Sequence, residues 1–136
     1  MPAGYSGTPL LKKLGIKPDT QLLWVDAPSQ YTDLLGPLPK DIQFLTEEGK
    51  EQADFIHVFM LRKDQLANQL LRLKPRLKKE GMIWISWPKQ RSSISTDLNR
   101  ETIREAGLET GLVDVKVCAI DADWSGLKFV YRKKDR

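Results

Sequence analysis

The chain has 136 residues, of which 40% are hydrophobic and 29% are charged, and its 22 basic and 18 acidic side chains leave a formal net charge of +4. This composition is typical of one soluble globular domain. One cysteine and one histidine exclude a disulfide framework and a cysteine-based zinc site, and they argue against a histidine-dependent triad or metal centre. No membrane-spanning run of ~20 apolar residues and no secretory signal is recognisable, so we expect a cytoplasmic protein.

Helices and strands are predicted to alternate along the first part of the chain. Thr8 as a cap and Pro9 at the first helical position predict a short helix that ends at Gly15. The unbroken apolar run within 21–26 predicts a strand buried on both faces. A short helix over 28–35 is expected next. A brief strand over 42–45 follows it.

The middle of the chain carries the strongest strand signal, over 53–61. Leucines at helical spacing predict a helix from Asp64 that is kinked or divided at Pro75 and ends at Gly81. A third strand is expected over 82–87, stopped by a proline.

The last part of the chain is predicted to contain a polar loop, a helix and a hairpin. In order, these are the loop 89–96, a helix from Asp97 or Asn99 to Ala106, and strands over 113–120 and 127–132. The short connection between the two strands indicates an antiparallel pair. The whole order predicts a three-layer, Rossmann-like α/β sandwich with a mainly parallel sheet and a C-terminal antiparallel hairpin. We expect one domain over 1–136, with an N-terminal arm over 1–7.

Two segments resemble class I methyltransferases. The stretch Lys17–Leu23 is similar to the lead-in to their first strand, and Leu77–Ile85 is similar to their "LKPGG-strand" segment. The terminal hairpin also fits that fold, so the resemblance implies a methyltransferase-like architecture.

A second set of motifs resembles a bacterial family of small proteins of unknown function. The motifs lie in Gly4–Leu10, Ser86–Lys89, Thr96-Asp97, Val113–Asp121 and Trp124–Leu127. This resemblance covers nearly the whole chain. It implies a compact methyltransferase-like fold and no established activity.

The turn after the first strand departs from the methyltransferase pattern. Those enzymes place glycines there so that the backbone can approach the cofactor, whereas Val25–Gln30 contains none. Pro28 lacks an amide donor, and Asp26 would face the cofactor's carboxylate with like charge. We therefore expect no cofactor, and no S-adenosylmethionine in the usual mode. Glu47 or Glu48 could still occupy the ribose-binding position, although a solvated loop is the simpler interpretation.

A candidate ligand site is predicted at the carboxyl edge of the sheet, where open α/β sheets bind ligands. Strand ends and neighbouring loops there contribute Asp26, Trp87, Lys89, Thr96, Asp97, Asp121, Asp123 and Trp124. Tyr5 and Ser6 could fold over this edge as a flap. Apolar walls with a few placed charges are typical of small-molecule sites.

Each member of this group also has a purely structural interpretation. Trp87 could cap the core, Trp124 could anchor the hairpin, and Asp26 could cap a helix. Lys89 could form an ordinary ion pair with Asp121 or Asp97. The convergence of these residues is therefore the basis of the prediction.

The remaining reactive residues favour structural roles. His57, inside an apolar strand, is expected to be a satisfied core histidine, and Cys118 a buried, inert thiol. No serine has an identifiable base. The basic residues cluster within 72–79, and acidic residues on the neighbouring segments (Asp64, Glu80, Glu101 and Glu105) prevent a continuous basic surface. A nucleic-acid-binding surface is therefore not expected.

Three functions remain open from the sequence. We favour a non-catalytic binding module that holds a small ligand or a partner protein at the Trp87, Lys89 and Trp124 edge. The alternatives are an S-adenosylmethionine-dependent methyltransferase with an atypical cofactor site, and a structural or interaction protein that forms a homodimer through the strand of Asp114 and Lys116 or through an exposed helix. Metal binding is not expected.

Overall fold

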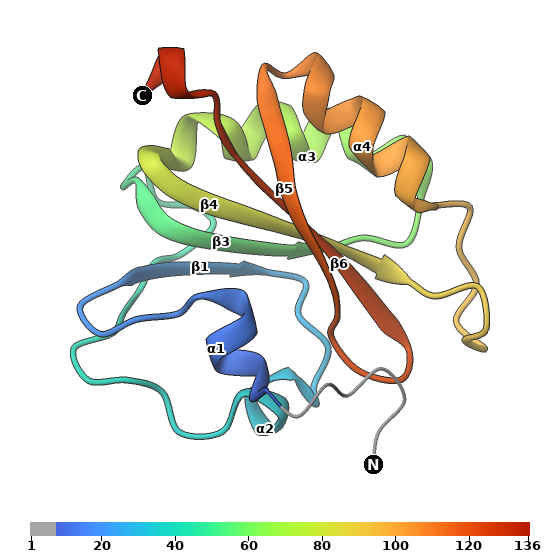
Figure 1. Ribbon diagram of the computed structural model, residues 1–136, viewed down its shortest axis with the longest axis horizontal. Helices are drawn as coiled ribbons and strands as arrows, with labels where there is room; N and C mark the ends of the chain where they lie inside the picture. Colours follow the sequence, from blue (N-terminus) through green and yellow to red (C-terminus); the bar gives the residue numbers. More distant parts are fainter. Residues whose placement is uncertain (1–7) are drawn as a thin grey trace.

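The computed structural model describes residues 8–136 and contains one six-stranded sheet between two layers of helices (Figure 1). The strands are β1 (Gln21–Val25), β2 (Gln43–Phe44), β3 (Ala53–Phe59), β4 (Leu77–Pro88), β5 (Leu112–Ala119) and β6 (Trp124–Tyr131). The α-helices are α1 (Leu10–Leu14), α2 (Tyr31–Leu35), α3 (Leu66–Leu73) and α4 (Arg100–Glu109). Single 3-10 turns lie at Lys63–Gln65, Lys74–Arg76 and Lys133–Asp135.

The sheet has the order β2-β1-β3-β4-β6-β5. The first four of these strands are parallel, and β6 runs antiparallel to both β4 and β5. This arrangement confirms the predicted mainly parallel sheet with a C-terminal antiparallel hairpin. The carboxyl ends of β1, β3 and β4 therefore lie at the same edge as the turn between β5 and β6 (Figure 1).

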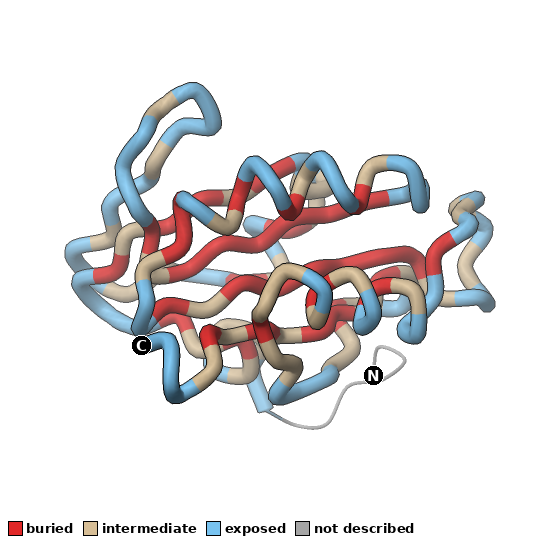
Figure 2. Tube along the Cα trace, turned by 90° about the horizontal axis from the view of Figure 1, so that it is seen from above, coloured by how far each residue is buried: buried red, intermediate tan, exposed pale blue. Residues whose placement is uncertain are grey.

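The core consists of two clusters, one on each face of the sheet. The helices α3 and α4 cover one face, and α1 and α2 cover the other (Figure 1). Buried residues follow the strands and the inner sides of the helices (Figure 2). The strand β1 is largely buried, as its unbroken apolar run predicted, and β3 and the second half of β4, Ile83–Pro88, are also buried on both faces.

The predicted helix from Asp64 to Gly81 is wrong in its second half. The helix α3 ends at Leu73, and Leu77–Gly81 already belong to β4. Pro75 explains the break, because a proline removes an amide donor and restricts the residue before it. Gly81 does not end a helix. A Cβ atom there would lie 2.8 Å from the carbonyl oxygen of Asp54, so glycine permits the close approach of β3 and β4.

Two smaller boundaries also differ from the expectation. The helix α1 begins at Leu10 after Pro9, and no side chain caps it, so Thr8 does not have the predicted capping role. The strand β6 begins at Trp124 rather than at residue 127, which shortens the hairpin turn. Within residues 8–136, no helix is long and apolar enough to span a membrane.

Candidate functional site

The loop 89–99 and the β5–β6 turn meet at the carboxyl edge of the sheet. The backbone nitrogen of Lys89 donates to the carbonyl oxygen of Asp123 at 2.8 Å, and Ser92 Oγ donates to Asp123 Oδ1 at 2.8 Å. In Figure 1, this loop follows the arrowhead of β4 and returns to the beginning of α4. The turn therefore anchors the first half of the loop.

Asp121 organises the β5–β6 turn itself. Its Oδ1 accepts from the backbone nitrogens of Asp123 and Trp124, each at 2.8 Å. Its Oδ2 accepts from Gln30 Nε2 at 3.2 Å, which joins the turn to the segment between β1 and α2. Both carboxylate oxygens of Asp121 thus serve the fold.

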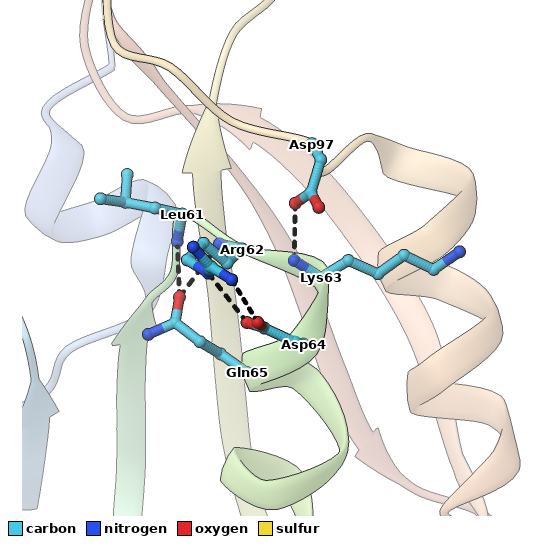
Figure 3. Close-up of polar contacts among 6 residues, drawn as sticks. All are labelled: Leu61, Arg62, Lys63, Asp64, Gln65 and Asp97. Atoms are coloured by element: carbon cyan, nitrogen blue, oxygen red, sulfur yellow. Dashed lines mark hydrogen bonds and ion pairs between the residues drawn. The ribbon is translucent and has the colours of Figure 1, made fainter.

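Thr96 and Asp97 connect the second half of the loop to the segment after β3. Thr96 Oγ1 donates to the carbonyl oxygen of Leu61 at 2.5 Å and accepts from the backbone nitrogen of Leu98 at 3.1 Å. Asp97 Oδ1 accepts from the backbone nitrogen of Lys63 at 2.6 Å (Figure 3). These contacts hold the loop 89–99 against the beginning of the α3 segment.

The segment after β3 is also ordered by its own side chains. Gln65 Oε1 accepts from the backbone nitrogens of Leu61 and Arg62, at 3.1 and 3.0 Å (Figure 3). Arg62 forms an exposed ion pair with Asp64, which raises the pKa of the guanidinium and lowers the pKa of the carboxyl. Arg62 lies at the carboxyl end of β3, but its side chain pairs with Asp64 and lines neither of the pockets described below.

Two adjoining pockets lie along this edge. The first, which we call the Trp87 pocket, has a volume of about 460 Å³ and is lined by Trp87, Lys89, Gln90, Arg91, Leu98, Asn99, Arg100, Ala122 and Ser125. The second, the serine pocket, has a volume of about 520 Å³ and is lined by the loop residues 89, 90 and 92–99. Both volumes suit a small molecule.

The structure brings four of the eight candidate residues to these pockets. Trp87 and Lys89 line the Trp87 pocket, and Lys89, Thr96 and Asp97 line the serine pocket. Trp87 is only 6% exposed, so it contributes an edge to the pocket and most of its ring to the core. Lys89 has no ion-pair partner among the described residues, so the alternative interpretation as an ordinary pair with Asp121 or Asp97 does not apply.

The other four candidates line neither pocket. Asp121 and Asp123 act in the turn, as described above. Trp124 is 6% exposed and packs edge-on against Phe59, with ring centroids 5.3 Å apart. Asp26 is exposed and adopts a left-handed φ of 56°, and the helix after it is preceded by Gln30 rather than capped by Asp26. Tyr5 and Ser6 lie outside the described residues.

Sequence reasoning missed the other polar side chains that line the two pockets, namely Gln90, Arg91, Ser92, Ser93, Ser95, Asn99, Arg100 and Ser125. The two arginines lie in a polar loop and in the first turn of α4, where basic residues are commonplace on a surface. Their position could have identified them as site residues, because both follow the carboxyl end of β4.

A separate group of polar side chains lies buried on the face of the sheet that α1 and α2 cover. His57 Nδ1 lies 2.6 Å from Tyr31 Oη, and Nε2 lies 2.7 Å from Ser86 Oγ. His57 is fully buried, which lowers its pKa to about 3 and keeps the ring neutral. The expected satisfied core histidine is confirmed, and its burial removes it from any solvent-accessible chemistry.

The remaining reactive groups are also held in the fold. Cys118 is half-buried rather than fully buried, and this burial raises the pKa of its thiol above the usual range. Glu47 pairs with Arg72 at 3.3 Å. Within residues 8–136, no group of three or more histidine, cysteine or carboxylate side chains is placed to hold a metal ion.

Comparison with known proteins identifies both a family and a fold. The sequence model of a family described as "Protein of unknown function (DUF3052)" matches residues 38–133. The expected family of unknown function is therefore supported, although the individual motifs are not tested by that match and the motif at 4–10 lies outside it. The search of curated proteins found no match to the sequence.

Several solved methyltransferases share the fold. A SAM-dependent methyltransferase from Aquifex aeolicus has a TM-score of 0.62 at 13% identity, over 88% of this chain and 86% of that chain. Aeropyrum pernix fibrillarin, solved with natively bound S-adenosyl-L-methionine, has a TM-score of 0.59 at 13% identity, over 93% and 70%. Magnesium protoporphyrin IX methyltransferase from Synechocystis PCC 6803, solved with bound SAH, has a TM-score of 0.59 at 8% identity, over 90% and 78%. These likenesses confirm the methyltransferase-like fold.

Proposed function

The chain belongs to the DUF3052 family of proteins of unknown function, and we propose that it is a non-catalytic binding module that holds a small ligand at the carboxyl edge of its sheet. The Trp87 pocket is the observation that supports this proposal most directly. It combines an apolar wall from Trp87 and Leu98 with the unpaired ammonium group of Lys89. It also lies where open α/β sheets bind their ligands.

Catalysis is disfavoured by the way in which the polar groups of this edge are used. The carboxylates of Asp121 and Asp97 each accept from backbone nitrogens, and Asp123 accepts from Ser92. A general acid or base needs to reach the substrate and to have a suitably perturbed pKa. The buried His57 does not line either pocket. These residues therefore supply a scaffold for binding and no reacting group.

The alternative function, S-adenosylmethionine-dependent methyl transfer, rests on the fold alone. The residues after β1 do not fit the cofactor in the mode that the resemblance implies. The turn contains no glycine, and Asp26 within it has a left-handed φ. Gln30, which follows Asp26 in the same segment, donates a hydrogen bond to Asp121 of the β5–β6 turn. The helix α2 has only five residues, and Tyr31 points into the core toward His57.

The loop after β2 also does not fit S-adenosylmethionine in the mode that the resemblance implies. Glu47 and Glu48 were the two candidates for the ribose, and the carboxylate of Glu47 pairs with Arg72 of α3. Arg76 holds the carbonyl oxygens of the same loop. Isothermal titration calorimetry with millimolar S-adenosylmethionine should give no heat. A saturable heat with a 1:1 stoichiometry would restore the methyltransferase alternative.

Self-association through β5 is a second candidate because β5 is an edge strand. Val115 and Val117 on it are 53% and 45% exposed. However, the register shift between Asp114 and Lys116 leaves Val115 unpaired with β6, and such bulges hinder edge-to-edge pairing. Light scattering distinguishes the two candidates, since a particle of twice the chain mass would favour a homodimer.

The binding proposal is tested by thermal shift against a panel of small metabolites, with and without charge. A ligand of the Trp87 pocket should raise the melting temperature of the native protein and should do so less in Lys89→Gln. Lys40→Gln is a matched control, because Lys40 is an exposed lysine away from both pockets. Trp87→Ala is a poorer variant, because most of the Trp87 ring lies in the core. If no compound stabilises the protein, the proposal is wrong.

A further inference from the structure

Three cationic side chains line the Trp87 pocket. They are Lys89, Arg91 and Arg100, and no carboxylate belongs to the lining. Within the part of the chain that the structure describes, none of the three side chains has an ion-pair or hydrogen-bond partner. Three like charges around one pocket repel one another, and a bound anion would relieve that repulsion.

The basic residues around Pro75 show how different this arrangement is. Arg72 pairs with Glu47, Lys78 pairs with Asp54, and Arg76 donates to three carbonyl oxygens. Lys74 donates to the carbonyl of Thr110, and Lys79 lies over the ring of Tyr131. The basic residues that looked like a cluster in the sequence are thus used inside the fold, whereas those of the Trp87 pocket remain free to bind a ligand.

Neutral donors and the beginning of α4 add to the positive character of the pocket. Asn99 and Ser125 both line it, and Asn99 Oδ1 caps α4 by accepting from the backbone nitrogen of Thr102. The amino end of this ten-residue helix, at Arg100, therefore borders the pocket with its partial positive charge. An oxyanion in the pocket would meet guanidinium, ammonium and amide donors together.

The adjoining serine pocket has a different chemistry. Ser92, Ser93, Ser95 and Thr96 line it, and it shares Lys89, Gln90, Leu98 and Asn99 with the Trp87 pocket. The hydroxyl groups of Ser92 and Thr96 are hydrogen-bonded within the fold, whereas those of Ser93 and Ser95 have no partner among the described residues. Its one carboxylate, Asp97, accepts from the backbone of Lys63. Hydroxyl groups can both donate to and accept from the hydroxyl groups of a ligand. Among residues 8–136, no exposed aromatic face borders either pocket, because Trp87 is only 6% exposed and is the one aromatic residue in either lining.

We propose that the ligand is a phosphorylated polyhydroxylated small molecule, of the sugar phosphate class, whose phosphate is bound by Lys89, Arg91 and Arg100. The planar fork of arginine matches a phosphate group with two parallel hydrogen bonds. The hydroxylated part of the ligand extends into the serine pocket. This inference rests on the proposed function and adds the chemical class of the ligand and two binding residues, Arg91 and Arg100. A stacked nucleobase is not provided for, since the site offers no aromatic face.

The test is a titration of the ¹⁵N-labelled full chain followed by its amide resonances, with ribose 5-phosphate, inorganic phosphate and ribose as probes. We expect ribose 5-phosphate to shift the amides of 89–100 and Ser125 in a saturable manner. Inorganic phosphate should shift a subset of the same amides with weaker affinity, and ribose should shift none at equal concentration. Arg91→Gln and Arg100→Gln should each weaken the binding of ribose 5-phosphate about tenfold, which is the size of a lost charge-assisted hydrogen bond.

Arg104→Gln is the matched control, because Arg104 lies on the same helix, pairs with Asp114 and lines neither pocket. Its affinity for ribose 5-phosphate should equal that of the native chain. If a neutral compound of the thermal-shift panel binds at 89–100 while no phosphorylated probe does, the ligand class is wrong and the binding function stands. If neither kind of compound binds, both proposals are wrong. A single-stranded oligonucleotide that binds more tightly than ribose 5-phosphate, with shifts that extend beyond the two pockets, would also overturn the small-molecule assignment.

Discussion

His57 Nδ1 lies 2.6 Å from the phenolic oxygen of Tyr31, and this hydrogen bond joins β3 to α2 inside the core. The other ring nitrogen lies 2.7 Å from Ser86 Oγ of β4. All three residues are buried. The bond therefore fixes α2 over the sheet, beside the turn in which methyltransferases of this fold place their cofactor glycines.

Because the ring of His57 is buried and neutral, we predict that the protein loses stability in mild acid. Burial lowers the pKa of His57 to about 3, whereas the ordinary value is 6.5. Between these values the unfolded chain binds a proton that the folded chain does not, so the free energy of unfolding falls as the pH falls below 6.5. The contribution is about 1 kcal/mol per pH unit.

Denaturant unfolding at pH 7 and pH 5 measures this contribution. His57→Gln should be less stable than the native chain at pH 7 but should lose about 2 kcal/mol less between the two pH values. Tyr31→Phe retains the imidazole and should keep the steep pH dependence. An equal pH dependence in the native chain and in His57→Gln would contradict the assignment.

A second prediction concerns Gly107 in the last turn of α4. A Cβ atom at this position would lie 2.1 Å from Cε2 of Phe129, a fully buried residue of β6. Gly107→Ala should therefore lower the free energy of unfolding by about 2 kcal/mol, although alanine itself favours the helix. Thermal unfolding checks this. The double variant Gly107→Ala with Phe129→Leu should lose less stability than the sum of the single variants, and additive losses would count against the steric explanation.

The strands and the overall topology were predictable from the sequence because burial on both faces leaves a direct pattern. The run Leu22–Val25 of β1 is wholly apolar, and the runs Phe55–Phe59 of β3 and Met82–Trp87 of β4 are each interrupted by one polar residue, while the β5–β6 connection is too short for a crossover. The extent of α3 was not predictable in this way. Leu77 continues the leucine spacing of α3, yet it begins β4, and it is buried in either conformation.

The location of the site was predictable from the sequence, whereas the residues that line it were less so. The carboxyl edge follows from the strand directions, but the use of each side chain depends on distant contacts. Asp121 meets Gln30 only in the folded chain, and Trp124 turns inward because it begins β6. That Arg91 and Arg100 lack partners is equally a property of the tertiary structure, which no local pattern records.

Arg76 supports a third prediction, because it is a buried arginine whose partners are carbonyl oxygens of the loop after β2. Its Nε donates to Glu51, its Nη1 to Glu47 and its Nη2 to Thr46, at 2.6, 3.2 and 3.1 Å. A lysine cannot reproduce this planar set of donors. Arg76→Lys should lower the free energy of unfolding by about 2 kcal/mol.

Hydrogen exchange and thermal unfolding together test this role of Arg76. In Arg76→Lys the amides of 46–52 should exchange faster, while those of β4 change less. Arg72→Lys is the control, because the contacts of Arg72 are exposed: a pair with Glu47, worth about 1 kcal/mol or less, and hydrogen bonds to Gln69 Oε1 of the same helix. Similar losses for the two variants would show that the three carbonyl bonds of Arg76 add nothing.

The last prediction separates the structural role of Asp121 from a role in ligand binding. Its Oδ1 accepts from the backbone nitrogens of Asp123 and Trp124, and an asparagine oxygen can accept from both in the same way. Asp121→Asn should therefore stay within about 1 kcal/mol of the native stability, whereas Asp121→Ala should lose about 2 kcal/mol because two partly buried amides lose their acceptor. Neither change should weaken the binding of ribose 5-phosphate tenfold, since Asp121 lines neither pocket. A loss of binding in Asp121→Asn at native stability would place this carboxylate in the site and would contradict its purely structural role.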